Sequence, residues 1–199
     1  KEIPEGWEVK SFTKVIKLSG GGTPSTDVPE YWNGDVSFYT PGDLSQHYYS
    51  IKTIKKITSL GLRKCSTRLF PPNTIFITAR GATVGGIAMA GIPMAMNQTC
   101  YAINGDTVND YFAHQLTLNI IKRLKTEAIG ATFGALVTKD FESQLVVEPD
   151  KSLINLFGNT VSSWYQFILN IIYQNQKLNE LNELVLSKMT KVETEKEVV

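Results

Sequence analysis

The feature that most constrains this chain is a long apolar repeat in its last third. Beyond Pro149, apolar side chains recur at spacings of three and four residues from Phe157 to Met189. This spacing marks one face of an α-helix, and its persistence over several heptads is typical of a helix that packs against another helix. A helix of about 35 residues is about 50 Å long, which is too long to lie entirely on a domain of about 150 residues. We therefore expect it to project; the alternative is an ordinary amphipathic core helix.

The same repeat predicts a contact surface, or seam, along this helix. Its expected members are Phe157, Val161, Trp164, Ile168, Ile171, Leu178 and Val185. An exposed apolar seam is unfavourable in water, and the chain has one long helix, so we expect two copies to pair through it. Parallel and antiparallel pairing both remain open. Asn175 falls on or beside the seam, where a buried polar side chain would fix the register.

These patterns divide the chain into three parts. Residues 1–150 form the expected globular domain and residues 151–191 the long helix. Residues 192–199 (VETEKEVV) have little apolar surface to bury and are expected to fray.

Short β-branched and aromatic runs in the globular part, such as Val36–Tyr39 and Thr74–Thr78, predict strands between Gly and Pro turn signals. One helix is predicted where Phe112, Leu116, Ile120 and Leu124 recur every four residues. Asn109 or Asp110 can cap its start, and Gly130 can follow its end. The predicted class is α+β: a small twisted β-sheet with flanking helices, followed by one long coiled-coil helix.

The charge of the chain is unevenly distributed. The net charge is +1, yet residues 44–105 contain no Asp or Glu and seven basic residues, which leaves 13 basic and 19 acidic residues elsewhere. The seven are Lys52, Lys55, Lys56, Arg63, Lys64, Arg68 and Arg80. A local excess of +7 within a nearly neutral total is typical of a nucleic-acid-binding surface. The alternative is a solvated basic face.

The chain lacks the residue patterns of catalysis. His47 and His114 have no paired Cys or Glu at metal-ligand spacing, and no Ser stands in a Gly-x-Ser-x-Gly sequence. Gly20–Gly22 leads into Thr23 rather than into the Gly-Lys-Ser/Thr of a nucleotide-binding loop. The Asn/Asp-Pro-Pro-Tyr motif of an amino-methyltransferase is also absent. We therefore expect a binding protein with no catalytic activity, no cofactor and no metal.

Cys65 and Cys100 are expected to be thiols of a cytoplasmic protein, because they are far apart and a chain of this length does not need a disulfide. The sequence contains no run of 18 apolar residues and no signal peptide, so we expect no membrane contact.

Short motifs of the globular part follow one another in a characteristic order. They are Ile3–Trp7 (IPEGW), Gly21–Ser25 (GGTPS), Tyr31–Trp32, Phe38–Leu44 (FYTPGDL), Ile75–Gly85 (IFITARGATVG), Met96–Gln98 (MNQ) and Gly130–Phe133 (GATF). This order, followed by the long helix, closely resembles a target recognition domain with its conserved helix, from the specificity subunit of type I restriction-modification systems. One departure stands at the start of the helix, where the family often has Pro-Pro-x-x-Glu-Gln and this chain has EPDKSL at 148–153.

The resemblance implies a division of labour. A specificity subunit reads double-stranded DNA, separate modification subunits bind S-adenosylmethionine and methylate adenine, and a restriction subunit translocates and cuts. A full specificity subunit has two recognition domains held apart by two antiparallel helices, so this chain, with one of each, resembles half a subunit. The expected partners are DNA, the modification and restriction subunits, and a second copy of the chain.

Within this framework Arg80 is expected to bind a guanine edge with two hydrogen bonds, or to bind a phosphate. Gly81, Gly85 and Gly86 would let DNA approach the backbone closely. The alternative is that Arg80 pairs with an acid and that Gly85–Gly86 forms a tight hairpin turn. The resemblance also implies that Asn97–Gln98, which readers of different sequences share, organises the fold or contacts the DNA backbone.

Two further groups of side chains are expected to contact DNA. Polar candidates for reading bases are Ser45, Gln46, His47, Tyr48 and Tyr49, and further contacts are expected from Thr23, Ser25 and Thr83. Basic candidates for binding phosphates are Lys52, Lys55, Lys56, Arg63 and Lys64.

Two other functions stay open. The second possibility is that the chain is the recognition-domain fragment of a single-chain restriction-methylation enzyme. The tail after the helix resembles a natural end, which favours the specificity subunit instead. The third function is a pure oligomerisation protein, and the acid-free stretch at 44–105 argues against it.

Overall fold

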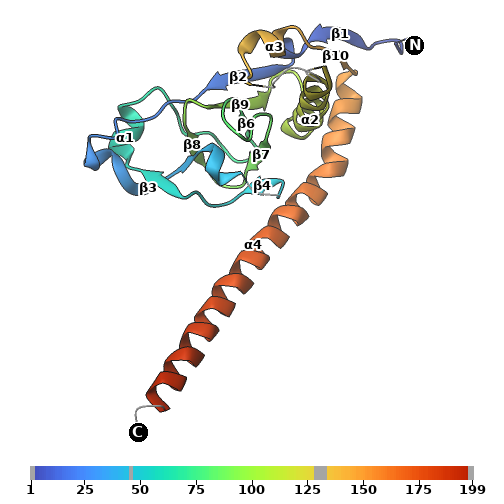
Figure 1. The fold of residues 1–199 in the computed structure, drawn as a ribbon. Helices are drawn as coiled ribbons and strands as arrows, with labels where there is room; N and C mark the ends of the chain where they lie inside the picture. Colours follow the sequence, from blue (N-terminus) through green and yellow to red (C-terminus); the bar gives the residue numbers. More distant parts are fainter. Residues whose placement is uncertain (1–2, 45–46, 128–133, 197–199) are drawn as a thin grey trace.

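The computed structural model describes residues 3–44, 47–127 and 134–196, and shows a globular part from which one long helix projects (Figure 1). This arrangement confirms the predicted α+β class. The described residues form three small sheets rather than the one that was expected.

The largest sheet has five strands, in the order β2 (Ile16–Gly20), β9 (Cys100–Gly105), β6 (Ile75–Thr78), β7 (Ile87–Ala90) and β4 (Tyr49–Ser50). A three-stranded sheet has the order β5 (Lys55–Ile57), β3 (Trp32–Tyr39) and β8 (Met94–Met96). The third sheet pairs β1 (Glu8–Ser11) with β10 (Leu145–Glu148). The helices are α1 (Ser59–Arg63), α2 (Asp110–Glu127), α3 (Thr138–Glu142) and α4 (Lys151–Lys196), and 3-10 turns cover Phe12–Lys14, Pro29–Tyr31 and Pro41–Asp43.

The five-stranded sheet is buried on both faces, as its central strand β6 shows. All four residues of β6 are buried, and successive side chains of a strand point to opposite faces. Ile75 and Ile77 belong to the apolar cluster that includes α2 and α4, whereas Phe76 belongs to a second cluster with Tyr39 and Phe70. Burial on both faces explains why β6 is a continuous apolar run rather than an alternating one.

Helix α2 begins with the cap that the sequence predicts. The Asn109 side chain accepts a hydrogen bond from the Phe112 N–H at 2.9 Å, so Asn109 is the capping residue. The neighbouring Asp110 carboxylate instead accepts from the Gly105 N–H at 2.8 Å and ties the helix to the end of β9. Gly130, the expected residue after the helix, lies outside the described residues.

Helix α4 is longer than the sequence predicts. It has 46 residues, which corresponds to about 69 Å. It continues to Lys196, into the segment that was expected to fray, and residues 197–199 lie outside the described part. Four of its side chains, Ile154, Tyr165, Leu169 and Ile172, are buried against the globular part. Asn175, Asn179 and Glu183 still line a pocket with residues 42–54, and beyond them the helix leaves the domain (Figure 1).

The start of α4 is fixed locally. The Asp150 carboxylate accepts a hydrogen bond from the Leu153 N–H at 3.0 Å and thereby caps the helix. Hydrogen bonds from the Ser152 hydroxyl and the Leu153 backbone hold the pKa of Asp150 below its usual value. The departure from the family pattern at this point is therefore compatible with a capped helix.

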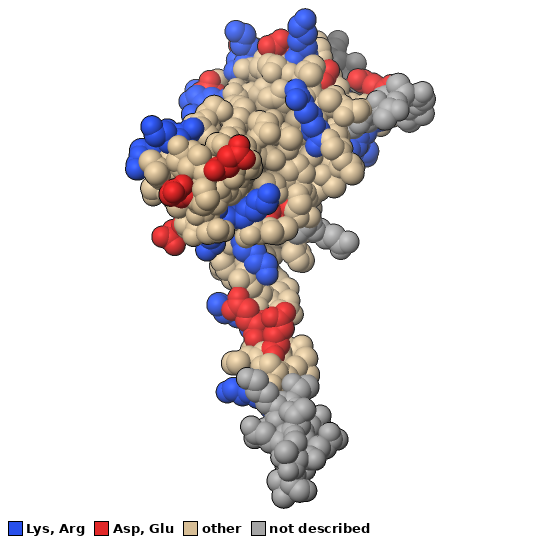
Figure 2. Space-filling view, turned by 60° about the vertical axis from the view of Figure 1, so that its left-hand side comes forward, with Lys and Arg blue, Asp and Glu red and all other residues tan. Residues whose placement is uncertain are grey.

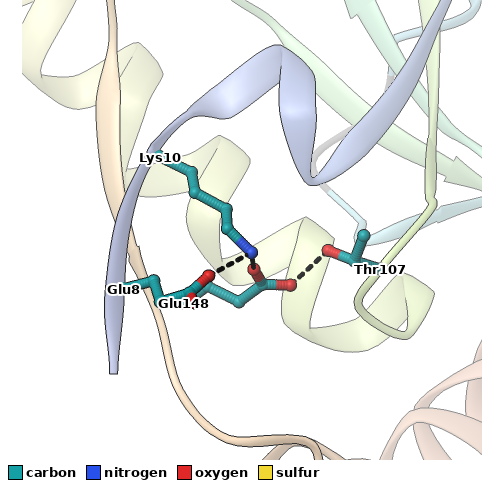
Figure 3. A network of polar contacts seen from close by, with 4 residues as sticks. All are labelled: Glu8, Lys10, Thr107 and Glu148. Atoms are coloured by element: carbon teal, nitrogen blue, oxygen red, sulfur yellow. Dashed lines mark hydrogen bonds and ion pairs between the residues drawn. The ribbon is translucent and has the colours of Figure 1, made fainter. Parts of the chain in front are cut away.

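A polar network joins the first and last strands of the globular part (Figure 3). The Lys10 ammonium on β1 contacts the Glu8 carboxylate at 2.6 Å and also the carboxylate of Glu148 on β10, to which the Thr107 hydroxyl donates a further hydrogen bond. Burial alone would raise the pKa of Glu148, but the hydrogen bonds from Lys10 and Thr107 hold that pKa below its usual value. The network fixes β1 against the strand that leads into α4.

Candidate nucleic-acid interface

The registers of the five-stranded sheet bring several loops to one of its ends. Gly20, the last residue of β2, pairs with Tyr101 near the start of β9, and β6, which is antiparallel to β9, ends at the same place. β7 begins there, with Ile87 paired with Ile77, whereas β4 pairs with the far part of β7, Tyr49 with Met89, which lies opposite Ile75. We call this the loop end of the sheet; its described loops are residues 21–25, 79–86 and 97–99.

Hydrogen bonds join the loops of the loop end to one another. The Ala79 N–H donates to the Thr99 carbonyl at 2.8 Å, which connects the loop after β6 to the loop before β9. The Thr23 hydroxyl donates to Oε1 of Gln98, which connects the loop after β2 to the same segment. The loops therefore form one continuous surface, and side chains on it hold fixed positions relative to one another.

Arg80 and Thr83 lie on this surface, in the loop between β6 and β7. Both side chains are exposed. Within the described part of the chain, the ion pairs do not include the Arg80 guanidinium. The expected alternative, in which Arg80 pairs with an acid, is therefore not seen among these residues.

The glycines around Arg80 serve different purposes. Gly81 has a positive φ of 98°, and a Cβ there would meet no atom within 4 Å, so its side is open. A Cβ on Gly85 would instead lie 2.5 Å from Cε of Lys125, and one on Gly86 would lie 2.3 Å from Cδ2 of Leu44. This corrects the expectation that all three glycines admit DNA: Gly85 and Gly86 admit other parts of the protein.

Asn97 organises the loop end, in agreement with the expectation. Its side-chain oxygen accepts hydrogen bonds from the Thr99 N–H at 3.2 Å and the Thr99 hydroxyl at 2.8 Å, and its N–H donates to the Tyr39 carbonyl at 3.0 Å. A Cβ on Gly21 would lie 2.1 Å from the Asn97 carbonyl oxygen. Gly21 thus lets two loops of the protein approach each other.

The segment before β4 presents Tyr48 beside α2 and His47 beside α4, away from Arg80. Both are exposed, and the Tyr48 ring, 51% accessible, lies edge-on against His114 at 5.8 Å between centroids. Tyr49 is buried, and its hydroxyl donates to the Asn73 side chain at 2.8 Å, so the expectation that Tyr49 reads bases is corrected. Parallel pairing of β4 with β7 turns Tyr49 into the core. Ser45 and Gln46 lie outside the described residues.

One carboxylate closes the base of the loop that carries these residues. Asp43 accepts hydrogen bonds from the Thr40 N–H and hydroxyl, both at 2.8 Å, and from the Ile54 N–H at 2.6 Å. It therefore joins the end of β3 to the segment that leads into β5, across residues 44–53. The negatively charged oxygens of Asp43 therefore face these N–H and O–H donors.

The seven basic residues of the acid-free stretch are all exposed, but they do not form one cluster. Lys55 and Lys56 lie on β5, at the edge of the three-stranded sheet, and Arg63 and Lys64 lie at the end of α1. Figure 2 shows basic side chains at several places on the visible face of the globular part, interspersed with acidic ones, and a further acidic group on the projecting helix. The structure therefore brings Thr23, Arg80 and Thr83 to the loop end, places His47 and Tyr48 beside α4 and α2, and places the other basic candidates on α1 and β5.

Other expected contacts have partners inside the protein. The pKa of Glu180 on α4 is lowered by hydrogen bonds from Lys177 and Gln176 and by the nearby charge of Lys52, so part of the Lys52 charge acts on the helix. The carbonyl of Ser25 accepts a hydrogen bond from Nε1 of Trp32 at 3.0 Å, which holds Ser25 near the start of β3.

Two lysines at the loop end were missed by the sequence analysis. Lys122 and Lys125 are exposed on the last turns of α2, and Nζ of Lys125 donates to the Gly85 carbonyl at 3.0 Å. A signal existed in the sequence, because residues 111–126 also contain no Asp or Glu.

Among the described residues, no group of three or more His, Cys, Asp and Glu side chains is placed to hold a metal ion. Within the same residues, no helix combines the length and apolar character needed to cross a membrane.

The expected seam on α4 is divided between two faces of the helix. Phe157, Val161 and Ile168 face the globular part: Phe157 lies edge-on against Phe112 at 5.6 Å between centroids, and the other two pack against the apolar cluster. These three residues belong to the contact between helix and domain, which corrects their assignment to a free seam. The spacing of three and four residues did not distinguish them because both faces carry apolar residues.

The remaining members of the predicted seam are exposed and lie seven residues apart. They are Trp164, Ile171, Leu178 and Val185. Phe167 and Leu181 are also exposed and occupy the intermediate positions of the same heptads. We call these six residues the exposed seam; the described residues contain nothing that covers it.

The comparison with known protein families decides which family this arrangement represents. A family model described as the type I restriction modification DNA specificity domain matches residues 4–152. The chain belongs to this family. The specificity domain thus covers the whole globular part, including the loop end, and stops where α4 begins.

Relatives of this specificity domain are longer proteins. The chain is 30% identical over 185 residues to the type I restriction enzyme MjaIX specificity subunit of Methanocaldococcus jannaschii, covering 90% of this chain and 43% of the relative. It is 28% identical over 191 residues to the HindI specificity subunit of Haemophilus influenzae, covering 94% and 41%. The HsdS subunit from Thermoanaerobacter tengcongensis has the same fold, with a TM-score of 0.59 at 14% identity over 84% of this chain and 39% of that one. The chain spans less than half the length of these proteins.

Proposed function

We propose that this chain reads the DNA target of a type I restriction-modification system and directs separate methyltransferase and restriction subunits to it. The observation that carries the proposal is the loop end, where loops from distant parts of a specificity domain converge on one connected surface. Membership in the family supports the same function. The chain itself performs no catalytic step in this proposal and acts on DNA in the cytoplasm.

Base reading is assigned to exposed polar side chains of the loop end. Arg80 has the geometry for two hydrogen bonds to the O6 and N7 of a guanine, and Thr83 is exposed in the same loop. Because hydrogen bonds fix the loops before DNA arrives, little conformational entropy is lost on binding. Lys55, Lys56, Arg63 and Lys64 contribute phosphate contacts, which strengthen binding without selecting a sequence.

The exposed seam is assigned to a second copy of the chain, paired in the antiparallel direction. In one antiparallel register Trp164 faces Leu181 of the partner, Phe167 faces Leu178, and, beyond the seam, Leu156 faces Met189. All six of these side chains are exposed in the isolated chain. In this register the domain-bearing segments of the two helices, residues 154–172 in each copy, follow one another along the pair instead of lying side by side. The dimer thereby reproduces two recognition domains from two half-length chains.

Selection of DNA from a random-sequence duplex pool tests the proposed reading of DNA. Bound duplexes are recovered over several rounds and sequenced, and we expect enrichment of one defined site. Arg80→Ala should lower affinity for that site by about 1–3 kcal/mol and relax preference at one base pair. Arg63→Ala, the matched control on α1, should weaken binding to all sequences alike. A wild-type chain that enriches no sequence would contradict the proposal.

A further inference from the structure

The end of α2 and the Arg80 loop form a shallow groove. The groove has a volume of about 490 Å³ and lies between Gly85 on one side and Ile121, Lys122 and Lys125 on the other. Nζ of Lys125 donates to the Gly85 carbonyl at 3.0 Å across it. The groove therefore opens at the loop end, beside the segment that carries Arg80.

The helix face that lines this groove carries only positive charge. Lys122 and Lys125 are exposed on it, and no acid occurs between residues 111 and 126. Glu127 follows Lys125 by two residues, and at 3.6 residues per turn it points to nearly the opposite side of the helix. The Arg123 guanidinium donates to the Leu145 carbonyl at 3.1 Å, away from the groove. An anion that enters the groove thus meets two ammonium groups and no carboxylate of α2.

From this arrangement we infer that the last turns of α2 are a DNA-backbone site, in which Lys122 and Lys125 bind phosphate groups. The inference rests on the proposed function, because DNA must lie across the loop end for its backbone to reach α2. When Arg80 contacts a base edge, the flanking backbone passes over one side of its loop, and α2 lies on such a side. An ammonium group has three N–H donors. Lys125 uses one for Gly85, which leaves two for a phosphate.

Lys125 is also a positioning residue for Arg80. Gly85 has a positive φ of 72°, and its carbonyl is held by the Lys125 ammonium, which fixes one end of the loop. Among the described residues Lys122 makes no such bond to the loop, so its substitution removes charge without loosening the Gly85 end of the loop. The two lysines therefore predict different phenotypes, which separates phosphate binding from loop positioning.

Salt-dependent binding to a mixed-sequence DNA duplex tests the inference without knowledge of the target. Affinity of the full chain is measured by fluorescence anisotropy between about 0.05 and 0.2 M salt, where each phosphate contact contributes a slope of about −0.9 to log K against log salt. Lys122→Ala should flatten the slope by about 0.9 and weaken binding several-fold at low salt, and Lys122→Glu should weaken it further. Lys14→Ala is the matched control, because Lys14 is exposed just before β2, at the opposite end of the sheet.

Lys125 variants complete the test on a duplex that contains the selected site. Lys125→Arg should preserve affinity and base preference, whereas Lys125→Ala should flatten the slope and also relax preference at the base pair that Arg80 reads. Thermal melting of Lys122→Ala establishes that it folds. If the wild type binds with a salt-dependent slope but both Lys122 variants behave like Lys14→Ala, the inference is wrong and the proposed function stands. If the wild type shows no salt-dependent binding, both the inference and the proposed function are wrong.

Discussion

At the scale of single residues, Asp43 stands immediately before the acid-free stretch, and its carboxylate holds the first part of that stretch in place. Its two oxygens accept three hydrogen bonds, from Thr40 and Ile54, at the base of the loop that presents His47 and Tyr48. Hydrogen bonds to a charged group contribute more than neutral ones, so Asp43→Ala should lower the free energy of unfolding by about 2 kcal/mol. Urea unfolding measures this, with Asp35→Ala, an exposed carboxylate on β3, as the control. Equal effects of the two substitutions would show that the loop does not depend on Asp43.

His114 predicts how stability depends on pH. Burial lowers its pKa from 6.5 to about 4, and its Nδ1 lies 2.7 Å from the Tyr165 hydroxyl. Between these two values the unfolded chain binds a proton that the folded chain does not. Stability is therefore fully present above about pH 6.5 and is lost as pH falls toward 4, by about 2 kcal/mol at pH 5. Urea unfolding at pH 7.5 and pH 5 checks this.

A His114→Asn variant is the control for that experiment. It keeps a polar side chain on α2 but has no group that titrates in this range, so the loss of stability between pH 7.5 and pH 5 should shrink. An unchanged loss in the variant would assign the effect to other groups.

At the scale of elements, the predictions concern the two faces of α4. Phe167→Lys combined with Leu178→Lys places charges on the exposed seam and should convert dimers into monomers without changing the stability of the globular part. Gln166→Lys, on the other side of the helix, should leave dimers intact. Light scattering at micromolar concentration measures the mass, with twice the chain mass of 22.1 kDa expected for the wild type. A wild-type monomer would contradict pairing of two copies.

Ile168→Lys should behave differently from these seam variants. Ile168 packs against the domain, so a charge there should lower the melting temperature of the globular part as well. A melting temperature equal to that of the Phe167 and Leu178 variant would place Ile168 on the seam after all.

Local patterns in the sequence predicted elements better than they predicted pairings. The periodicity of apolar residues predicted the long helix and α2, and the continuous apolar run at 74–78 predicted β6, because helix and strand periodicities are local properties of the sequence. Tyr48 and Tyr49 are neighbours with the same side chain, yet one is exposed and the other buried. The difference arises from the parallel pairing of β4 with β7, between segments about 40 residues apart, which no local pattern reveals.

The candidate site was predictable where exposure follows from a loop, as for Arg80 and Thr83. It was not predictable where a second element completes it. Lys122 and Lys125 are remote in sequence from the acid-free stretch at 44–105, and only the packing of α2 beside the Arg80 loop brings them to it. The division of the α4 stripe into two faces likewise depends on where the globular part lies.

At the scale of the whole molecule, the antiparallel dimer predicts the form of the DNA site. Two-fold symmetry requires two identical half-sites in inverted orientation. In the proposed register residue 172 of one copy faces residue 173 of the other, so the segments that carry the two domains follow one another along the pair, and the half-sites should be separated by a spacer. Sequencing of the selected duplexes reveals this interrupted palindrome. A compact uninterrupted site would instead support a parallel pair.

The ion pair between Lys10 on β1 and Glu148 on β10 also bears on how such proteins diversify. The chain enters the globular part and leaves it along two adjacent, hydrogen-bonded strands (Figure 3). Domains whose ends lie close together tolerate being moved as a unit. A recombination event with crossovers before β1 and after β10 would transplant every loop of the loop end at once and leave α4 with its exposed seam unchanged. A new target would then arise in one genetic step, while the proposed pairing surface is inherited intact.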